Sequence, residues 1–188
     1  MTYLEILTDI CSRVADPLLD TYKDRAKDHF NRALTNMIVA GEYIDSDIRG
    51  YIKLKVNLVF TVNPYDASAL RILDVVEIMP TPITATTYSA YYKTFEEMKM
   101  VSGISELQPE PTEVFIYMVG ISMYAVYSTP SNFTVATDTF YMKYIEIIDS
   151  STWIDATILT GAPYWFSDNF LRRGIEMATK TLLDEVKL

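Results

Sequence analysis

The sequence predicts an α+β protein in which a helical bundle bears an antiparallel β-meander. Apolar residues recur every three or four positions in the first forty residues and again over residues 167–187, which indicates helices. Residues 114–148 are instead dense in β-branched and aromatic residues and are interrupted by turn-forming positions, which indicates strands. The chain has 188 residues, so we expect one domain over residues 1–188.

Residues 1–41 are predicted to form a helical hairpin. Thr2 and Glu5 have the spacing of a capping box, and a short Asp-Pro loop ends the first helix. The second helix is expected to begin at Asp20 or at the threonine that follows it. Gly41 is expected to end it, because glycine favours helix C-termini.

A β-rich portion is expected over residues 52–148. Residues 46–62 fit a helix or a strand, and apolar alternation at period two favours a strand over 52–62. The next expected elements are a turn at 63–66, a strand at 69–79, an extended connector at 80–87 and a short inserted helix near 88–100.

The remaining strands are expected to form the antiparallel meander. They are predicted at 114–119, 121–127 and 139–148, with a tight turn at Gly120. Both faces of these strands are fairly apolar, so each face needs cover from the same chain or from a neighbour. A C-terminal helix over 167–187, capped by Ser167, closes the sequence.

The composition excludes several kinds of catalytic site. Cys11 and His29 are the single cysteine and histidine, so neither an internal disulfide nor a Cys/His zinc cluster can form. The six glycines are scattered and spell no nucleotide-binding loop. We expect no cofactor and no bound metal, a packed or interfacial histidine and a buried cysteine.

Carboxylates leave one enzymatic alternative open, a metal-dependent hydrolase. It would use Asp24, Asp28 or the pair Asp45 and Asp47. Lysine and arginine side chains interleave with the first group, however, which is typical of a solvated, salt-bridged helix face. We therefore favour the surface interpretation.

The net charge of −9 argues against general nucleic-acid binding, because affinity for phosphates requires lysine and arginine. No apolar run has the length of a membrane span, so we expect no membrane association. The 14 tyrosines suit half-buried contact surfaces, because the ring packs while the hydroxyl stays in water. The residues predicted to form an interface are Tyr117, Tyr124, Tyr127, Phe133, Tyr141, Tyr144 and Trp165.

The order of segments resembles the head-to-tail adaptor proteins of tailed bacteriophages, also called connector-ring or tail accessory proteins. In that family a helix ends in a short Asp/Pro turn and the next helix carries an aromatic-Asn-x-Ala step, here residues 30–33 (FNRA). Residues 114–147 resemble the family's paired strands, and the helix at 167–187 resembles its closing helix. The chain departs from the family at 63–66, where Asn-Pro-Tyr-Asp replaces a Leu-Pro-Asp-like turn.

The resemblance implies a structural virion protein rather than an enzyme. Such proteins are made in the host cytoplasm and form a homo-oligomeric ring, commonly twelve-fold, beneath the portal protein. They extend the DNA channel without binding DNA specifically, and they present a platform to the next tail or ring component. A different virion part, such as a tail-completion protein, is the alternative within this class.

Overall fold

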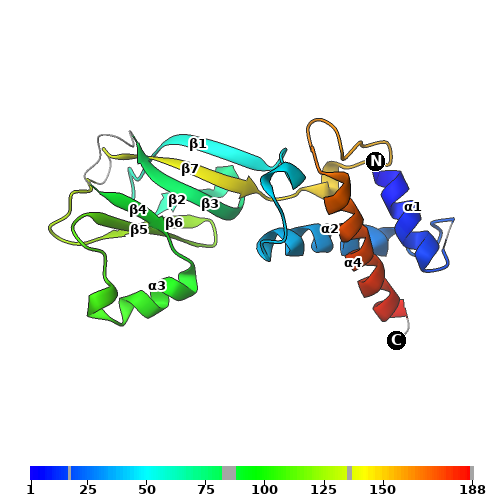
Figure 1. Cartoon of the computed structure of the whole chain (residues 1–188), viewed down its shortest axis with the longest axis horizontal. Coiled ribbons are helices and arrows are strands. Elements are labelled where there is room, and N and C mark those ends of the chain that lie inside the picture. The colour runs from blue at the N-terminus through cyan, green and yellow to red at the C-terminus, as the bar shows by residue number, and fades with distance from the viewer. Residues whose placement is uncertain (17, 82–87, 135–136, 187–188) are drawn as a thin grey trace. The chain divides into compact units, whose positions relative to one another are not determined.

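The computed structural model describes residues 1–188 except 17, 82–87, 135–136 and 187–188 (Figure 1). It has the predicted α+β class. The chain divides into two compact units, a subdivision that the expectation of one domain did not include. We call residues 1–52 with 147–188 the helical unit, and residues 53–146 the sheet unit.

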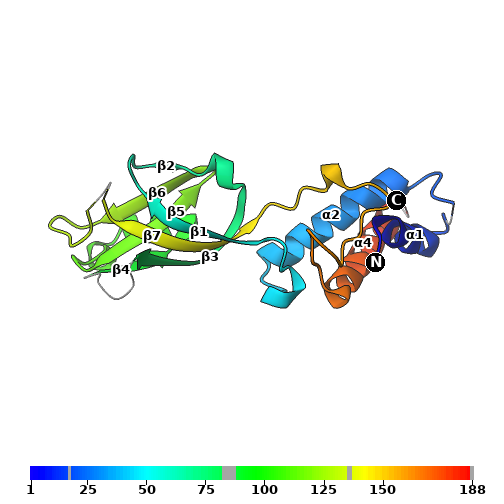
Figure 2. The same ribbon diagram turned by 90° about the horizontal axis from the view of Figure 1, so that it is seen from above.

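The helical unit is built from α1 (Tyr3–Arg13), α2 (Lys23–Val39) and α4 (Asp168–Val186). Helix α4 packs against both α1 and α2 (Figure 2). The predicted capping box of α1 is confirmed. The Thr2 amide donates to Glu5 Oε2 at 2.7 Å, and the Glu5 amide donates to Thr2 Oγ1 at 3.2 Å.

Helix α2 begins later than predicted, at Lys23. The carboxylate of the buried Asp16 accepts hydrogen bonds from the amides of Asp20, Thr21 and Tyr22 at 3.2, 3.0 and 2.7 Å. These amides are held by a side chain from the preceding loop, so they stay outside the helix and no local residue caps it.

The C-terminus of α2 is as predicted. Gly41 lies just beyond the helix at φ +72°, a conformation that glycine adopts without strain. Its amide donates to Ile38, and the Glu42 amide donates to Met37 at 2.8 Å. This pair of bonds is a Schellman motif, which satisfies the last carbonyls of the helix.

Helix α4 crosses α2 closely at Gly174. A Cβ atom at this position would lie 2.7 Å from Leu34 Cδ2 and 3.1 Å from Phe30 Cε2, so glycine permits the approach. At the start of α4, the Phe170 amide donates to Ser167 Oγ at 3.1 Å, which confirms the predicted cap.

The sheet unit holds a three-stranded antiparallel sheet in the order β1-β7-β3 and a four-stranded mixed sheet in the order β2-β6-β5-β4. The strands are β1 (Ile52–Val59), β2 (Tyr65–Asp66), β3 (Ile72–Thr81), β4 (Ser89–Tyr92), β5 (Glu113–Val119), β6 (Ser122–Tyr127) and β7 (Thr139–Glu146). Short 3₁₀ turns lie at Asp45–Asp47, Ser68–Leu70, Ser105–Leu107 and Ser150–Thr152.

The predicted meander is correct only for the β5–β6 hairpin, which turns at Gly120 with φ +59°. Strand β7 does not continue it and pairs with β1 and β3 in the other sheet. Because β7 alternates buried and half-buried residues, it faces the shared core with one side only. Phe60 and Phe140 meet there edge to face, with ring centroids 5.7 Å apart.

The predicted helix near 88–100 is wrong in its first half. Residues Ser89–Tyr92 form β4, which pairs in parallel with β5, and helix α3 occupies Phe95–Ser102. Thr94 caps the start of the helix: its hydroxyl accepts a hydrogen bond from the Glu97 amide, and the Glu97 carboxylate accepts one from the Thr94 amide. Pairing with β5 therefore outweighs the local helical spacing of the tyrosines.

The earlier strands agree better with the sequence. The strand favoured over 52–62 is confirmed as β1, and the strand expected over 69–79 is confirmed as β3, with a start three residues later. The expected turn at 63–66 contains the short strand β2. Most of the expected connector at 80–87 lies outside the described residues.

Candidate functional site

Two of the predicted interface residues form one aromatic surface on the four-stranded sheet. Tyr117 and Tyr124 are cross-strand partners on β5 and β6, and their rings stack with centroids 5.1 Å apart. Phe95, at the start of α3, stacks on Tyr117 at 6.5 Å. Helix α3 buries the neighbouring Phe115 but leaves both tyrosines half-buried. This surface has the amphipathic chemistry of a protein interface.

Four other predicted residues lie in different settings. Phe133 and Tyr144 are buried in the core of the sheet unit, so they offer no side-chain surface to a partner in this structure. Tyr127 is 36% exposed and packs its ring edge to face against Phe133. Tyr141 is half-buried on β7, opposite Met79 of β3.

Trp165 belongs to the helical unit and is 50% exposed. It lies in the loop before α4, where its neighbours Tyr164 and Phe166 pack against the rings of Trp153 and Tyr51. The loop is therefore held by buried rings while one large indole faces outward. The six other predicted interface residues belong to the sheet unit.

Two exposed apolar surfaces were not selected from the sequence. One is on β1, where Leu54 and Val56 are 61% and 58% exposed. The other is on α3 and the turn after it, where Met100 is 62% exposed. Its remaining members are Ile104 and Leu107, both about half exposed.

The β1 surface follows from a local break in the strand. Asn57 adopts φ +54°, and after it Leu58 and Phe60 are buried while Leu54 and Val56 stay outside. The period-two alternation in the sequence predicted a strand but could not show that its first half lies outside the core. Exposed large apolar residues at neighbouring positions are typical of interaction sites.

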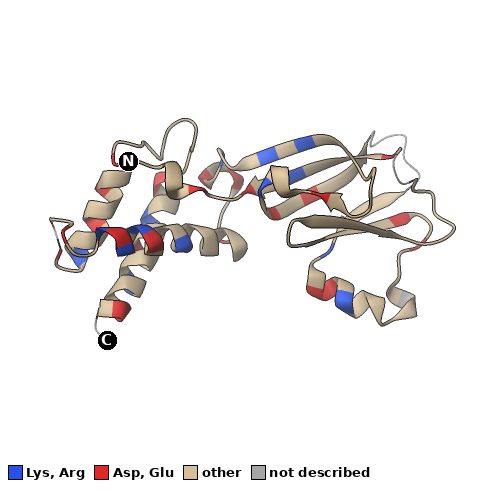
Figure 3. Ribbon diagram, turned by 180° about the vertical axis from the view of Figure 1, so that it is seen from behind, with Lys and Arg blue, Asp and Glu red and all other residues tan. Residues whose placement is uncertain are grey.

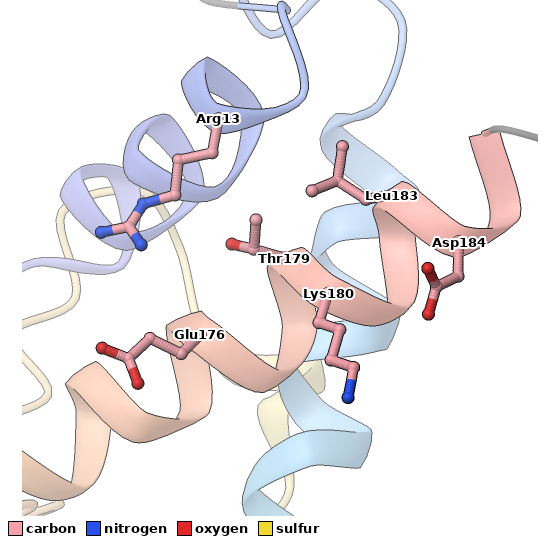
Figure 4. Close-up of a pocket in the computed structure, with 6 residues that line it drawn as sticks. All are labelled: Arg13, Glu176, Thr179, Lys180, Leu183 and Asp184. Atoms are coloured by element: carbon pink, nitrogen blue, oxygen red, sulfur yellow. The ribbon is translucent and has the colours of Figure 1, made fainter.

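A hollow of the helical unit lies between α1 and α4 (Figure 4). It has a volume of about 280 Å³ and is lined by Arg13, Glu176, Thr179, Lys180, Leu183 and Asp184. The Thr179 hydroxyl is buried, and none of the residues that the structure describes forms a hydrogen bond with it. Because the charged residues around it have both signs, the hollow selects neither an anion nor a cation.

The carboxylates of the hydrolase alternative are dispersed. Asp24 and Asp28 are exposed on α2, and Asp24 pairs with Lys27 at 3.5 Å. Asp47 is buried, and its carboxylate accepts a hydrogen bond from Ser167 Oγ and a longer one, of 3.4 Å, from the Arg173 guanidinium. These bonds hold the start of α4 in place. In the part of the chain that the structure describes, no group of three or more His, Cys, Asp or Glu residues could hold a metal ion.

The lone histidine and cysteine take the roles expected for packed residues. His29 on α2 lies 2.6 Å from Glu185 of α4, and this contact lowers the pKa of the Glu185 carboxyl. Cys11 is fully buried, and burial raises the pKa of its thiol. The His29–Glu185 contact joins α2 to α4.

No protein-family model matches the chain, and no curated protein is significantly similar to it. The resemblance to phage adaptors therefore stays a prediction. None of the helices over the described ranges is long and apolar enough to cross a membrane.

Proposed function

We propose that this chain is a non-enzymatic subunit of a head–tail connector ring in a tailed bacteriophage. In this role it is made in the host cytoplasm, docks beneath the portal protein at the head–tail junction and joins the capsid to the next tail component. The observation that carries the proposal is the amount of apolar surface that a small sheet unit leaves uncovered. The exposed large apolar residues of the sheet unit include Leu54, Val56, Val62, Tyr91, Phe95, Met100 and Ile121.

The arrangement of the bundle supports the same proposal. A helical hairpin is closed by the C-terminal helix, and the strands lie between them in the sequence, which is the order that the adaptor resemblance implies. A ring subunit must also contact two neighbours and the portal at once. A chain with separate exposed surfaces in both units has the surface for several such contacts.

The charge of the chain supports a channel through which DNA passes without being held. The net charge is −9, and acidic and basic groups alternate along the helices (Figure 3). A surface of this kind repels phosphates on average, since retention of DNA depends on neutralising them. We therefore expect no specific DNA binding by the ring.

Native mass spectrometry of the chain mixed with the portal protein of the same phage tests the proposal. We expect one complex with a fixed number of copies per portal ring, twelve in the commonest arrangement of the adaptor class. Solution mass of the chain alone is no substitute, because an adaptor of this class can stay monomeric until it docks. A portal that stays free at every ratio contradicts the proposal.

A further inference from the structure

One side chain closes the outer edge of strand β6. The Asn63 side chain lies beside Ala125 of β6, 62 positions away in the sequence. Its Nδ2 donates to the Ala125 carbonyl at 2.8 Å, and its Oδ1 accepts from the Ala125 amide at 3.1 Å. The side-chain amide therefore forms the two hydrogen bonds that a residue of a further strand would form.

The backbone groups of Ala125 point away from β5. Ala125 is the register partner of Ile116 on β5, but its amide and carbonyl bond to Asn63 on the other side of β6. Residues of a strand direct these groups to alternate sides, so Met123 and Tyr127 direct theirs to the same edge as Ala125. This edge therefore presents a donor and an acceptor at every second residue of β6.

Strand β2 covers one end of this edge, next to β6 (Figure 1). The register that pairs Tyr65 with Met123 places Asn63 opposite Ala125. Pro64 lies between Asn63 and β2, and proline has no amide hydrogen to donate to a ladder. The Asn63 side chain thus occupies the edge at the point where the backbone pairing of β2 has ended.

We propose that Asn63 forms an autoinhibitory contact, which keeps the edge of β6 from accepting an extended strand. An open sheet edge is a template for pairing with another chain. The strand that it would accept is the same edge of a second copy, because an edge with alternating donors and acceptors is complementary to itself in an antiparallel pair. The contact is independent of the proposed function.

Asn63→Ala removes both hydrogen bonds and opens the amide and carbonyl of Ala125. Sedimentation velocity of the full-length chain over a range of concentrations measures the effect. We expect the dissociation constant of a dimer to fall at least about tenfold relative to the unchanged chain, because an incoming strand no longer has to displace two hydrogen bonds. An absent dimer, or an unchanged dissociation constant, overturns the proposal.

Amide hydrogen exchange locates the contact. In the unchanged chain the Ala125 amide is bonded to Asn63 and should exchange slowly. In Asn63→Ala the peptide with residues 123–127 should exchange faster at low protein concentration. It should regain its protection at high concentration, when a second strand covers it. A dimer that protects another segment and leaves this peptide unchanged contradicts the proposal.

Two further variants separate an open edge from other effects of the substitution. Asn63→Ser has a side chain too short to reach both backbone groups of Ala125, so it should dimerise as Asn63→Ala does. Asn63→Asp keeps an acceptor for the Ala125 amide and adds a charge that repels its copy across the edge, so it should dimerise no more strongly than the unchanged chain. Equal association of the aspartate and alanine variants refutes the autoinhibitory role.

Ile78→Val is the control for lost stability. Ile78 is buried in the core of the same unit, on β3, and its shortening leaves the edge of β6 intact. Circular dichroism checks that each variant folds. We expect Ile78→Val to dimerise no more strongly than the unchanged chain. If it associates as Asn63→Ala does, general destabilisation is the cause and the proposal fails.

Discussion

Gly50 lies against the loop that leads into α4, where a methyl group has no room. A Cβ atom at this position would lie 2.2 Å from the carbonyl oxygen of Tyr164 and 2.4 Å from that of Pro163. Since ordinary contacts begin at about 3.4 Å, the loop would have to withdraw by roughly 1.2 Å in Gly50→Ala. Both neighbours are backbone atoms, so no side-chain rotation relieves the overlap.

The loop cannot withdraw freely, because aromatic rings hold it. The ring of Tyr51 lies 4.9 Å from that of Phe166 and 6.5 Å from that of Tyr164, and Phe166 also forms a β-bridge with Ile48. Overpacking costs about 1–3 kcal/mol, and each loosened aromatic pair adds about 0.5–1.5 kcal/mol. We expect Gly50→Ala to lower the free energy of unfolding of the helical unit by about 3 kcal/mol.

Tryptophan fluorescence during urea unfolding measures this change. Both tryptophans of the chain, Trp153 and Trp165, belong to the helical unit, so the signal reports on that unit. With a slope of about 1–2 kcal/mol per molar urea, the midpoint should fall by about 1.5–3 M.

Gly161→Ala is the control for this substitution. Its added methyl group meets only Ile158 Cγ2, at the ordinary distance of 3.5 Å. We expect its stability to stay within about 0.5 kcal/mol of the unchanged chain. If Gly50→Ala unfolds at the same urea concentration as this control, the close approach at Gly50 is refuted.

Three further predictions concern the helical unit. Asp16→Ala removes the acceptor of three amide hydrogen bonds before α2, so the free energy of unfolding should fall by about 1–2 kcal/mol; an unchanged urea midpoint would contradict the capping role. Burial raises the pKa of Tyr3 from 10.0 to about 12. The folded state therefore holds the phenol proton more tightly, and stability should fall as the pH rises from 10 towards 12. Tyr3→Phe should weaken this dependence of the urea midpoint on pH, and an equal slope in both proteins would count against it. Cys11 is fully buried with a raised pKa, so a thiol-specific chromogenic reagent should react with it only when the chain unfolds, and fast reaction in the folded state would disprove its burial.

Helix boundaries were predictable where the decisive contact is local. Thr2 caps α1 with Glu5 three residues away, and Gly41 closes α2 through its neighbours, so both could be predicted from spacing. The start of α2 was not predictable in this way. Asp16 reaches across a loop to three amides, and sequence spacing does not encode that geometry.

Strand pairing depends on contacts between distant parts of the sequence, and here the prediction failed in part. The high density of apolar and aromatic residues in β7 correctly indicated a strand but did not specify its partners, which are β1 and β3 rather than β6. The same limit explains β4. Its tyrosines have a spacing that also suits a helix, and only the parallel neighbour β5 decides between the two.

The candidate site could be predicted by residue type but not by exposure. Tyrosine content indicated half-buried aromatic surfaces, and the stacked rings of Tyr117 and Tyr124 are half-buried on one face of the four-stranded sheet. Phe133 and Tyr144 were selected on the same grounds, as aromatic residues of the predicted strands and their loop, yet both are buried in the core. Leu54 was not selected from the sequence, yet it is exposed, because the backbone turn at Asn57 leaves its side chain outside the core.

Negative-stain imaging of the chain with its portal tests the central claim most directly. The account predicts closed rings of this chain stacked on the portal, with a central opening that continues the DNA channel. Class averages of bare portals, with the chain present in excess and folded, would contradict it.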